Sequence, residues 1–451
     1  MKMKCYLAGV LALISAVPLA FAELPAVPPG AATPQETGAW LHADQEALQE
    51  ARQRLADQAA EQSDTTPLLP VIDEFRVLIE TDPELFMLFT QMFEQIPHEP
   101  QFEKDAAGHP AARDYREMLR LMNQAVTQPP QFNKTGMVGF PINAIVNWAM
   151  GTPAGASAFL NDKVNRQLKK ILAYWAVYLR SADSRWVLND KPNTGWFGRD
   201  ARAAMPTFDK DFVSDPKLHY HGFASWDDFF TRVFREGRRP VASPDDERVI
   251  DNACESAPYR LATGVKLRDR FWIKDQPYSL IHMLADDPLA AQFEGATVYQ
   301  AFLSALSYHR WHSPVSGRIV KTRVIDGSYY AATPAVGFDP VSPNESQGYI
   351  TQVASRALIF IKADNPQIGL MAAMFVGMAE VSSNEITVYE GQHVEKGDQL
   401  GMFHYGGSTH TLIFRPQVDL EFDLHDQTPG LHSENIPVRE RIATVRNQGA
   451  N

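Results

Sequence analysis

Hydrophobic positions near the start of the chain repeat with the spacing of a helix. Between residues 38 and 62, apolar residues recur three, four and seven positions apart with charged residues between them, at Leu41, Leu48, Ala51 and Leu55. This pattern predicts an amphipathic helix, because such residues fall on one helical face.

The same spacing continues through three further runs. Residues 68–96 predict two helices, the second starting at Asp82-Pro83, since proline suits the first turn of a helix. Residues 111–128 and 164–181 predict one helix each. A mostly helical N-terminal domain is therefore predicted for residues 37–205.

The pattern changes after about residue 225. A short helix ends at Gly237, two prolines follow, and from there to about residue 445 short alternating runs are separated by Gly, Pro, Asn and Asp. The predicted fold class is therefore α+β, with residues 206–451 forming a β-rich domain.

Two segments of this second domain each contain a pair of short strands around a glycine turn. Residues 312–330 and 386–403 resemble the hairpins of the flattened β-sandwich found in biotinyl and lipoyl carriers, so a barrel-sandwich-like arrangement is expected. A carrier needs an attachment lysine at a hairpin tip, and neither segment shows the usual tip sequence. A carrier role is therefore disfavoured.

The N-terminus has the pattern of a secretory signal. Lys2 and Lys4 precede an apolar stretch that ends in Ala20-Phe21-Ala22. Such a segment predicts cleavage after Ala22 and export to the periplasm or the medium; if uncleaved, it would instead be an N-terminal membrane anchor. Residues 23–36 are rich in Pro, Ala and Gly and predict a flexible leader.

Charge and cysteine content exclude several classes of function. A net charge of −12 argues against nucleic-acid binding and gives no general attraction to anionic membranes. Cys5 lies inside the signal, so the mature chain keeps only Cys254. An internal disulfide and a multi-cysteine metal site are thereby excluded.

Three short clusters carry residues that could do chemistry, namely "SPDDE" (243–247), "YHRWHSP" (308–314) and "GGST" (406–409). His309 and His312 would share a face only on a helix, and the following Ser-Pro argues against one. Without a third histidine at ligand spacing, no metal site is expected. Taken singly, the two histidines suit core or turn positions, and the other two clusters suit turns.

Taken together, these clusters resemble the phosphatidylserine decarboxylase family, whose members process themselves and carry a pyruvoyl group. The similarity runs from about Trp226 to about Phe422. The helical N-terminal region resembles the extension of a branch that includes tryptophan decarboxylases. The matching segments, besides the three clusters, are "FFTRVFREGRRP" (229–240), "FVGMAEV" (375–381) and "VEKGDQLGMF" (394–403).

The resemblance implies a role for each cluster. Ser408 would attack the Gly407 carbonyl, cleave the chain between them and become the pyruvoyl cofactor. His312 would be the base for this step, oriented by Asp246, and His309 would donate the proton in decarboxylation. The products would be a β-chain of residues 23–407 and an α-chain of residues 408–451, with Thr409 assisting by hydrogen bonding.

The implied reaction is decarboxylation of an amine-bearing substrate through a Schiff base with the pyruvoyl group. Two substrates fit: phosphatidylserine, converted to phosphatidylethanolamine with peripheral membrane contact, and a free amino acid, aromatic or other. The predicted export favours a soluble amine.

One residue departs from the family pattern. Glu247 follows Asp246 where the family usually has glycine, which leaves open whether Asp245 or Asp246 partners His312. The same departure motivates an alternative: a family member that does not process itself and only binds a ligand or partner.

Overall fold

The computed structural model describes most of the chain from residue 67 onward. The predicted signal, leader and first helix lie outside the described residues. These are 67–99, 102, 112–133, 140–270, 277–333 and 345–446.

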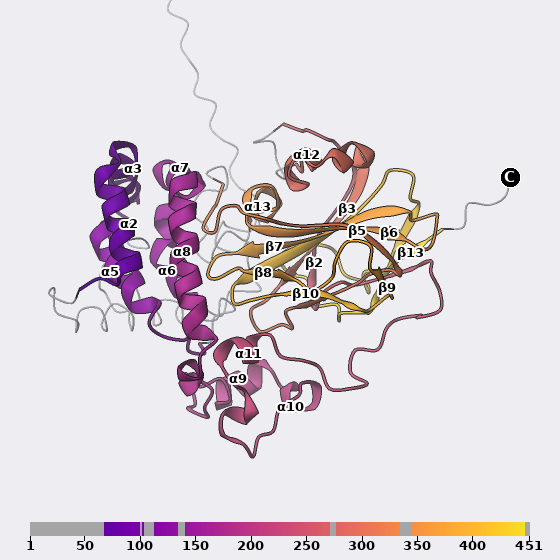
Figure 1. The fold of residues 1–451 in the computed structure, drawn as a ribbon, viewed down its shortest axis with the longest axis horizontal. Helices are drawn as coiled ribbons and strands as arrows, with labels where there is room; N and C mark the ends of the chain where they lie inside the picture. Colours follow the sequence, from indigo (N-terminus) through magenta and orange to yellow (C-terminus); the bar gives the residue numbers. More distant parts are fainter. Residues whose placement is uncertain are drawn as a thin grey trace, which may run out of the picture.

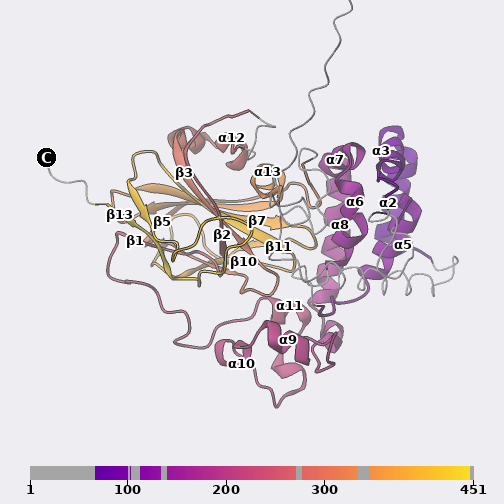
Figure 2. The same ribbon diagram turned by 180° about the vertical axis from the view of Figure 1, so that it is seen from behind.

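The N-terminal part consists of two layers of helices beside the sheet (Figures 1 and 2). Both views place α8 between the outer helices and the sheet. Nowhere in the described chain is a helix both long and apolar enough to cross a membrane. The helices are α2 (Pro70–Thr81), α3 (Pro83–Glu94), α5 (Tyr115–Ala125), α6 (Pro141–Met150), α7 (Pro153–Leu160) and α8 (Asp162–Leu179).

Local capping explains where several of these helices begin. The Asp82 side chain accepts hydrogen bonds from the amides of Glu84 and Leu85, and Pro83 occupies the first turn, so the predicted start of α3 is confirmed. Asn161 caps α8 through the Lys163 amide. That helix therefore starts at Asp162, two residues before the predicted Val164.

Helical structure continues beyond the predicted boundary at residue 205. A second group of short helices lies below the first in Figure 1. Its aromatic residues, including Trp196, Trp226 and Phe229, belong to the same hydrophobic core as the longer helices. The elements are η2 (Ala182–Val187), α9 (Arg199–Ala204), α10 (Phe208–Asp211), η3 (His219–Gly222) and α11 (Trp226–Phe230).

In the described part of the chain, the largest sheet has seven strands, and its pairings are antiparallel. The strand order is β2 (Ala257–Val265), β3 (Ala296–Leu303), β11 (Gly407–Phe414), β7 (Leu370–Met378), β6 (Arg356–Ala363), β5 (Gly317–Ile325) and β9 (His393–Val394).

Two three-stranded sheets complete the β part. One has the order β1 (Val249–Asp251), β13 (Arg441–Val445), β12 (Leu420–Phe422), and the other the order β4 (Arg310–His312), β10 (Gln399–Phe403), β8 (Asn384–Ile386).

Both faces of the seven-stranded sheet are buried. One face packs against α12 (Leu280–Met283), η4 (Pro288–Phe293) and α13 (Gln347–Val353). The other packs against the small sheets, where Trp311 of β4 stacks on Phe375 of β7 with ring centroids 4.2 Å apart. The predicted α+β class is thus confirmed.

A buried histidine joins the helical and β parts. The Nδ1 of His404, just after β10, lies 2.9 Å from a carboxylate oxygen of Asp227 in α11, and its Nε2 lies 2.9 Å from Glu385 in β8. Burial acts to lower the pKa of His404, but the two carboxylates outweigh it and the pKa is raised. The imidazolium form therefore binds both carboxylates in the folded protein.

This ion cluster predicts a loss of stability at high pH. Because the pKa is higher in the folded protein, the ion cluster makes its full contribution to the free energy of unfolding below the ordinary histidine pKa of about 6.5. This contribution disappears as the pH rises through the folded-state pKa. Urea denaturation at about pH 6 and about pH 9 should show a larger drop in the midpoint for the wild type than for His404→Gln. His393→Gln is the matched control, since His393 pairs with Asp364 at the surface. Equal drops in the wild type and His404→Gln would contradict the assignment.

Candidate active site

Ser408 is buried in β11, an interior strand of the large sheet. On β11 it pairs with Leu303 of β3 on one side and Gly377 of β7 on the other. Its side chain is 0% exposed, and its hydroxyl makes no hydrogen bond to any described residue. Burying a hydroxyl without a hydrogen-bond partner costs free energy of folding, so this unbonded oxygen calls for a functional explanation.

Two glycines beside Ser408, Gly406 and Gly377, are required by the close approach of Ser382. A Cβ at Gly406 would lie 2.7 Å from the Ser382 Oγ, and a Cβ at Gly377 would lie 2.6 Å from the Ser382 Cβ. At Gly407 the contacts are looser, 3.1 Å to the Met378 carbonyl oxygen. The paired glycines therefore mark a close backbone approach rather than a simple turn.

The segment that carries Ser382 has an unusual backbone. Ala379, Glu380 and Ser382 have φ values of 54°, 35° and 41°, a region that residues other than glycine seldom occupy. Hydrogen bonds hold it in place, from the Ser382 amide to the Tyr405 carbonyl at 2.9 Å and from the Ala379 amide to the Tyr329 carbonyl at 3.0 Å. Such local strain is typical of functional sites.

His309 lies in the same corner of the protein as Ser408. Its carbonyl accepts a hydrogen bond of 2.9 Å from Phe403 at the end of β10, five residues before Ser408. Its ring stacks on Phe230, 3.9 Å between centroids, and neither ring nitrogen bonds another described residue. Burial, together with the Arg232 guanidinium, keeps the pKa of His309 well below its ordinary value.

Arg232 is a site residue that the sequence analysis did not single out. Its guanidinium donates to the carbonyls of Leu306 (2.5 Å) and Ser307 (2.8 Å), which lead directly into Tyr308-His309. It thereby fixes the loop that carries the histidines. The sequence could have indicated Arg232, because it lies in "FFTRVFREGRRP", one of the segments that carry the family resemblance.

His312 is held by groups other than those predicted. Its Nδ1 lies 2.8 Å from the Gly397 carbonyl, which assigns the ring proton to Nδ1, and its Nε2 accepts from the Tyr308 hydroxyl at 2.9 Å. The Arg439 guanidinium lies 3.1 Å from Nδ1. Burial and this nearby charge lower the pKa of His312 to about 3.

The structure does not bring Asp246 to His312, which corrects the predicted orienting contact. The Asp246 carboxylate instead binds the Arg248 guanidinium, and this ion pair lowers its pKa. The Lys396 ammonium holds the same loop through the carbonyls of Ser243 (2.8 Å) and Asp246 (2.9 Å). Because both ring nitrogens of His312 have other neighbours, Asp245 does not take that place either.

Two buried acids flank the residue whose carbonyl bonds the His312 amide. The His312 amide bonds the Ala253 carbonyl, which is flanked two residues away by Asp251 and Glu255. Burial raises the pKa of Asp251 to about 7, and Glu255 binds Arg239 at 2.6 Å. In the sequence these acids sit in an apolar stretch and gave no distinct signal.

His410 was also missed. Strand alternation places it on the same face of β11 as Ser408, with its ring near those of Phe375 and Tyr299. It is 0% exposed, its ring nitrogens bond no described residue, and burial lowers its pKa to about 3. It adds a second neutral histidine to this face.

Thr409 points to the opposite face of the sheet. Its hydroxyl donates to the Ala301 carbonyl at 2.9 Å and accepts from Gln300 at 3.0 Å. It therefore braces β11 against β3 and does not contact the Ser408 side chain. Of four aromatic residues that could form substrate walls, Phe271 and Trp272 lie outside the described residues, while Tyr278 and Phe375 are buried in the core.

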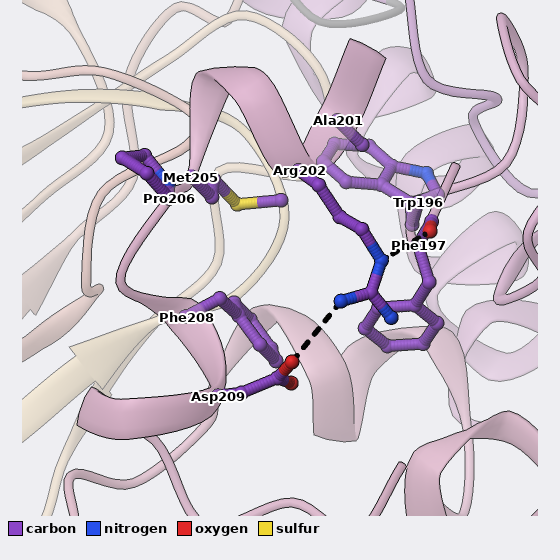
Figure 3. Close-up of a pocket in the computed structure, with 8 residues that line it drawn as sticks. All are labelled: Trp196, Phe197, Ala201, Arg202, Met205, Pro206, Phe208 and Asp209. Carbon is purple, nitrogen blue, oxygen red and sulfur yellow. Dashed lines mark hydrogen bonds and ion pairs between the residues drawn. The ribbon is translucent and has the colours of Figure 1, made fainter. Parts of the chain in front are cut away.

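Two cavities are lined by neither Ser408 nor the histidines near it. Figure 3 shows a cavity of about 50 Å³ beside α9 and α10, across which Arg202 reaches Asp209 at 3.1 Å. A larger one of about 550 Å³ lies between α8 and the end of β5 and is lined by residues of both charges, including Arg166 and Asp326. It opens at the end of the sheet where Ser408 lies, because Ile325, Arg356 and Gly377 occur at that end of successive strands.

Comparison with known proteins gives a consistent result. Family models described as phosphatidylserine decarboxylase match residues 69–205 and 226–436. An L-tryptophan decarboxylase of Psilocybe cubensis is 36% identical over 430 residues, 90% of this chain and 94% of that protein. Decarboxylase iboD of Amanita muscaria is 43% identical over 349 residues, 71% of this chain and 99% of that protein.

Similarity to a lipid enzyme covers a smaller share of the chain. Phosphatidylserine decarboxylase proenzyme 3 of Schizosaccharomyces pombe is 30% identical over 197 residues, 44% of this chain and 19% of that protein. The chain therefore belongs to the phosphatidylserine decarboxylase family and is a carboxy-lyase acting on an amine-bearing substrate.

Proposed function

We propose that this decarboxylase generates a pyruvoyl group by cleaving its own chain between Gly407 and Ser408. The observation that carries the proposal is the Ser408 hydroxyl, fully buried beside two glycines and bonded to no described residue. The surroundings fit the group, since a glycine, which has no side chain, precedes the serine and the neutral His410 lies on the same face of β11.

The proposed cleavage uses only atoms of this chain and water. The Ser408 Oγ attacks the Gly407 carbonyl carbon, the peptide C–N bond breaks, and the hydroxyl proton passes to the Ser408 nitrogen, leaving an ester. Removal of the Ser408 α-proton then breaks the Cβ–Oγ bond and releases the Gly407 carboxylate. The remaining enamine becomes an imine, and water replaces its nitrogen, which leaves as ammonia.

His312 is the proposed base for this cleavage, acting through Tyr308. Its Nε2 accepts a hydrogen bond from the Tyr308 hydroxyl, so a proton can be passed from the tyrosine to this ring. The Gly397 carbonyl, in place of the predicted Asp246, holds the ring in the required tautomer.

His309 is the proposed proton donor in decarboxylation. The pyruvoyl group, once formed, supplies the electron sink for the pair left behind by carbon dioxide. Because the pKa of His309 is depressed, its ring is neutral at rest and must first take up a proton, which it then gives to the carbanion. The stack on Phe230 fixes the direction in which the ring points.

We propose a free aromatic amino acid as the substrate rather than a serine phospholipid. The similarity to the tryptophan decarboxylase covers both parts of the chain, whereas that to the lipid enzyme covers less than half. The residues before Ser408 also lie in an aromatic cluster, in which Tyr405 contacts Phe140, Trp175, Trp226 and Phe230. Aromatic side chains stack favourably with one another.

The first prediction from this proposed function concerns cleavage. Denaturing electrophoresis and intact mass of the wild type should show an α-chain of residues 408–451 with a modified N-terminus. Ser408→Ala should stay full-length because it lacks the attacking oxygen. Thr411→Val is the matched control, since it removes another unbonded hydroxyl from the described part of β11. A full-length band in the wild type would instead indicate a family member that only binds a ligand.

The second prediction separates the two histidines. His312→Ala should block or strongly slow cleavage. His309→Ala should cleave normally yet release carbon dioxide about 10²- to 10⁴-fold more slowly, the usual contribution of a general acid. His425→Ala, an exposed histidine, is the control. Normal decarboxylation by cleaved His309→Ala would reject its role.

The third prediction concerns the substrate. Carbon dioxide release should be faster from L-tryptophan and other aromatic amino acids than from aliphatic ones, because the surrounding walls are aromatic. Vesicles containing phosphatidylserine should give little release. The reverse order would favour a lipid substrate and leave the cleavage proposal intact.

A further inference from the structure

Glu380 joins the β part to the start of a helix in the N-terminal region. Its carboxyl is 0% exposed; one oxygen accepts from the Asn143 amide at 3.0 Å and the other from the Tyr330 hydroxyl at 3.3 Å. Asn143 lies in the first turn of α6, where the backbone amides have no partner within the helix. Glu380 therefore caps α6 from outside.

The N-terminal end of α6 lies beside the predicted cleavage site. Phe140, the residue before α6, stacks on Tyr405 with ring centroids 5.7 Å apart and the planes nearly parallel. Its ring edge is also the nearest side-chain group of the helical region to Gly407, with the Phe140 Cζ 3.7 Å from where a Cβ would stand. The helical region thus contacts residues on both sides of Gly406.

The backbone of Glu380 approaches the same site from the other side. It belongs to the left-handed segment 379–382, whose Ser382 lies against Gly406 and Gly377. Gly377 is the strand partner of Ser408. Glu380 thereby connects α6, which follows Phe140, with the turn that carries Ser382.

We propose that Glu380 is a positioning residue for self-cleavage. By holding the start of α6, its carboxyl keeps Phe140 against Gly407 and Tyr405, and the helical region forms one wall of the cleavage site. The inference rests on the proposed cleavage between Gly407 and Ser408.

The carboxyl acts here through hydrogen bonds more than through charge. Burial raises the pKa of Glu380 to about 8, so the group is largely neutral at pH 7. A glutamine side chain has the same shape and can accept from the Asn143 amide while donating to the Tyr330 oxygen. An alanine leaves both groups without a partner.

The experiment follows cleavage of the full-length chain after pulse-labelling in cell-free translation. Glu380→Ala and Phe140→Ala should lengthen the half-time by at least about tenfold, the rate effect of one lost buried hydrogen bond or wall contact. Glu380→Gln should cleave within about threefold of the wild type because its acceptor oxygen remains.

The matched control is Asp287→Ala, which removes another buried capping carboxyl, bonded to the Leu289 amide and Lys321. It should lower the urea midpoint as Glu380→Ala does and leave the cleavage half-time unchanged. This comparison separates positioning from a general loss of stability.

Three results would overturn the inference: wild-type cleavage in folded Glu380→Ala, equal slowing in Glu380→Gln and Glu380→Ala, or wild-type cleavage in Phe140→Ala. The last variant decides the matter if Glu380→Ala fails to fold, since it removes only a ring. A wild-type chain that never cleaves would instead reject the proposed function itself.

Discussion

The register of β11 between β3 and β7 is the constraint on which the site depends. It places Ser408 opposite Leu303 and Gly377 and turns its hydroxyl toward the buried face that also holds His410. A shift of one residue would exchange this serine with Thr409, whose hydroxyl faces the opposite side of the sheet. The bonds from Thr409 to Ala301 and Gln300 oppose such a shift.

Burial governs the electrostatics of this corner. His309, His312 and His410 all have lowered pKa values because they are removed from water, so the site holds neutral imidazoles, one of them near the buried Arg232. At the junction of α11 and β8, by contrast, His404 is hydrogen-bonded to two carboxylates, which raise its pKa and favour the imidazolium form. The same side chain type therefore serves as a proton carrier in one place and as a structural ion in another.

Sequence reasoning succeeded where a local pattern was sufficient. Helical spacing and the Asp82-Pro83 cap located α3, and six ordered segments indicated the family, which the comparisons confirm. It failed for Asp246, because "SPDDE" resembles the family motif while its carboxylate pairs with Arg248 two residues away. Arg232 and Glu255 escaped notice because their partners, Leu306 and Arg239, lie far along the chain. Asp251 escaped notice because no motif in the sequence marks it.

The sequence by itself determined the fold class, the family and the Gly-Gly-Ser-Thr segment, since these depend on residue spacing and on residues close in the chain. Only the tertiary structure decided what surrounds that segment. Ser382 explains Gly406, the Gly397 carbonyl orients His312, and Glu380 brings Phe140 of the helical region against Gly407. These contacts join residues 24 to 267 positions apart, and long-range packing of this kind leaves no periodic pattern in a single chain.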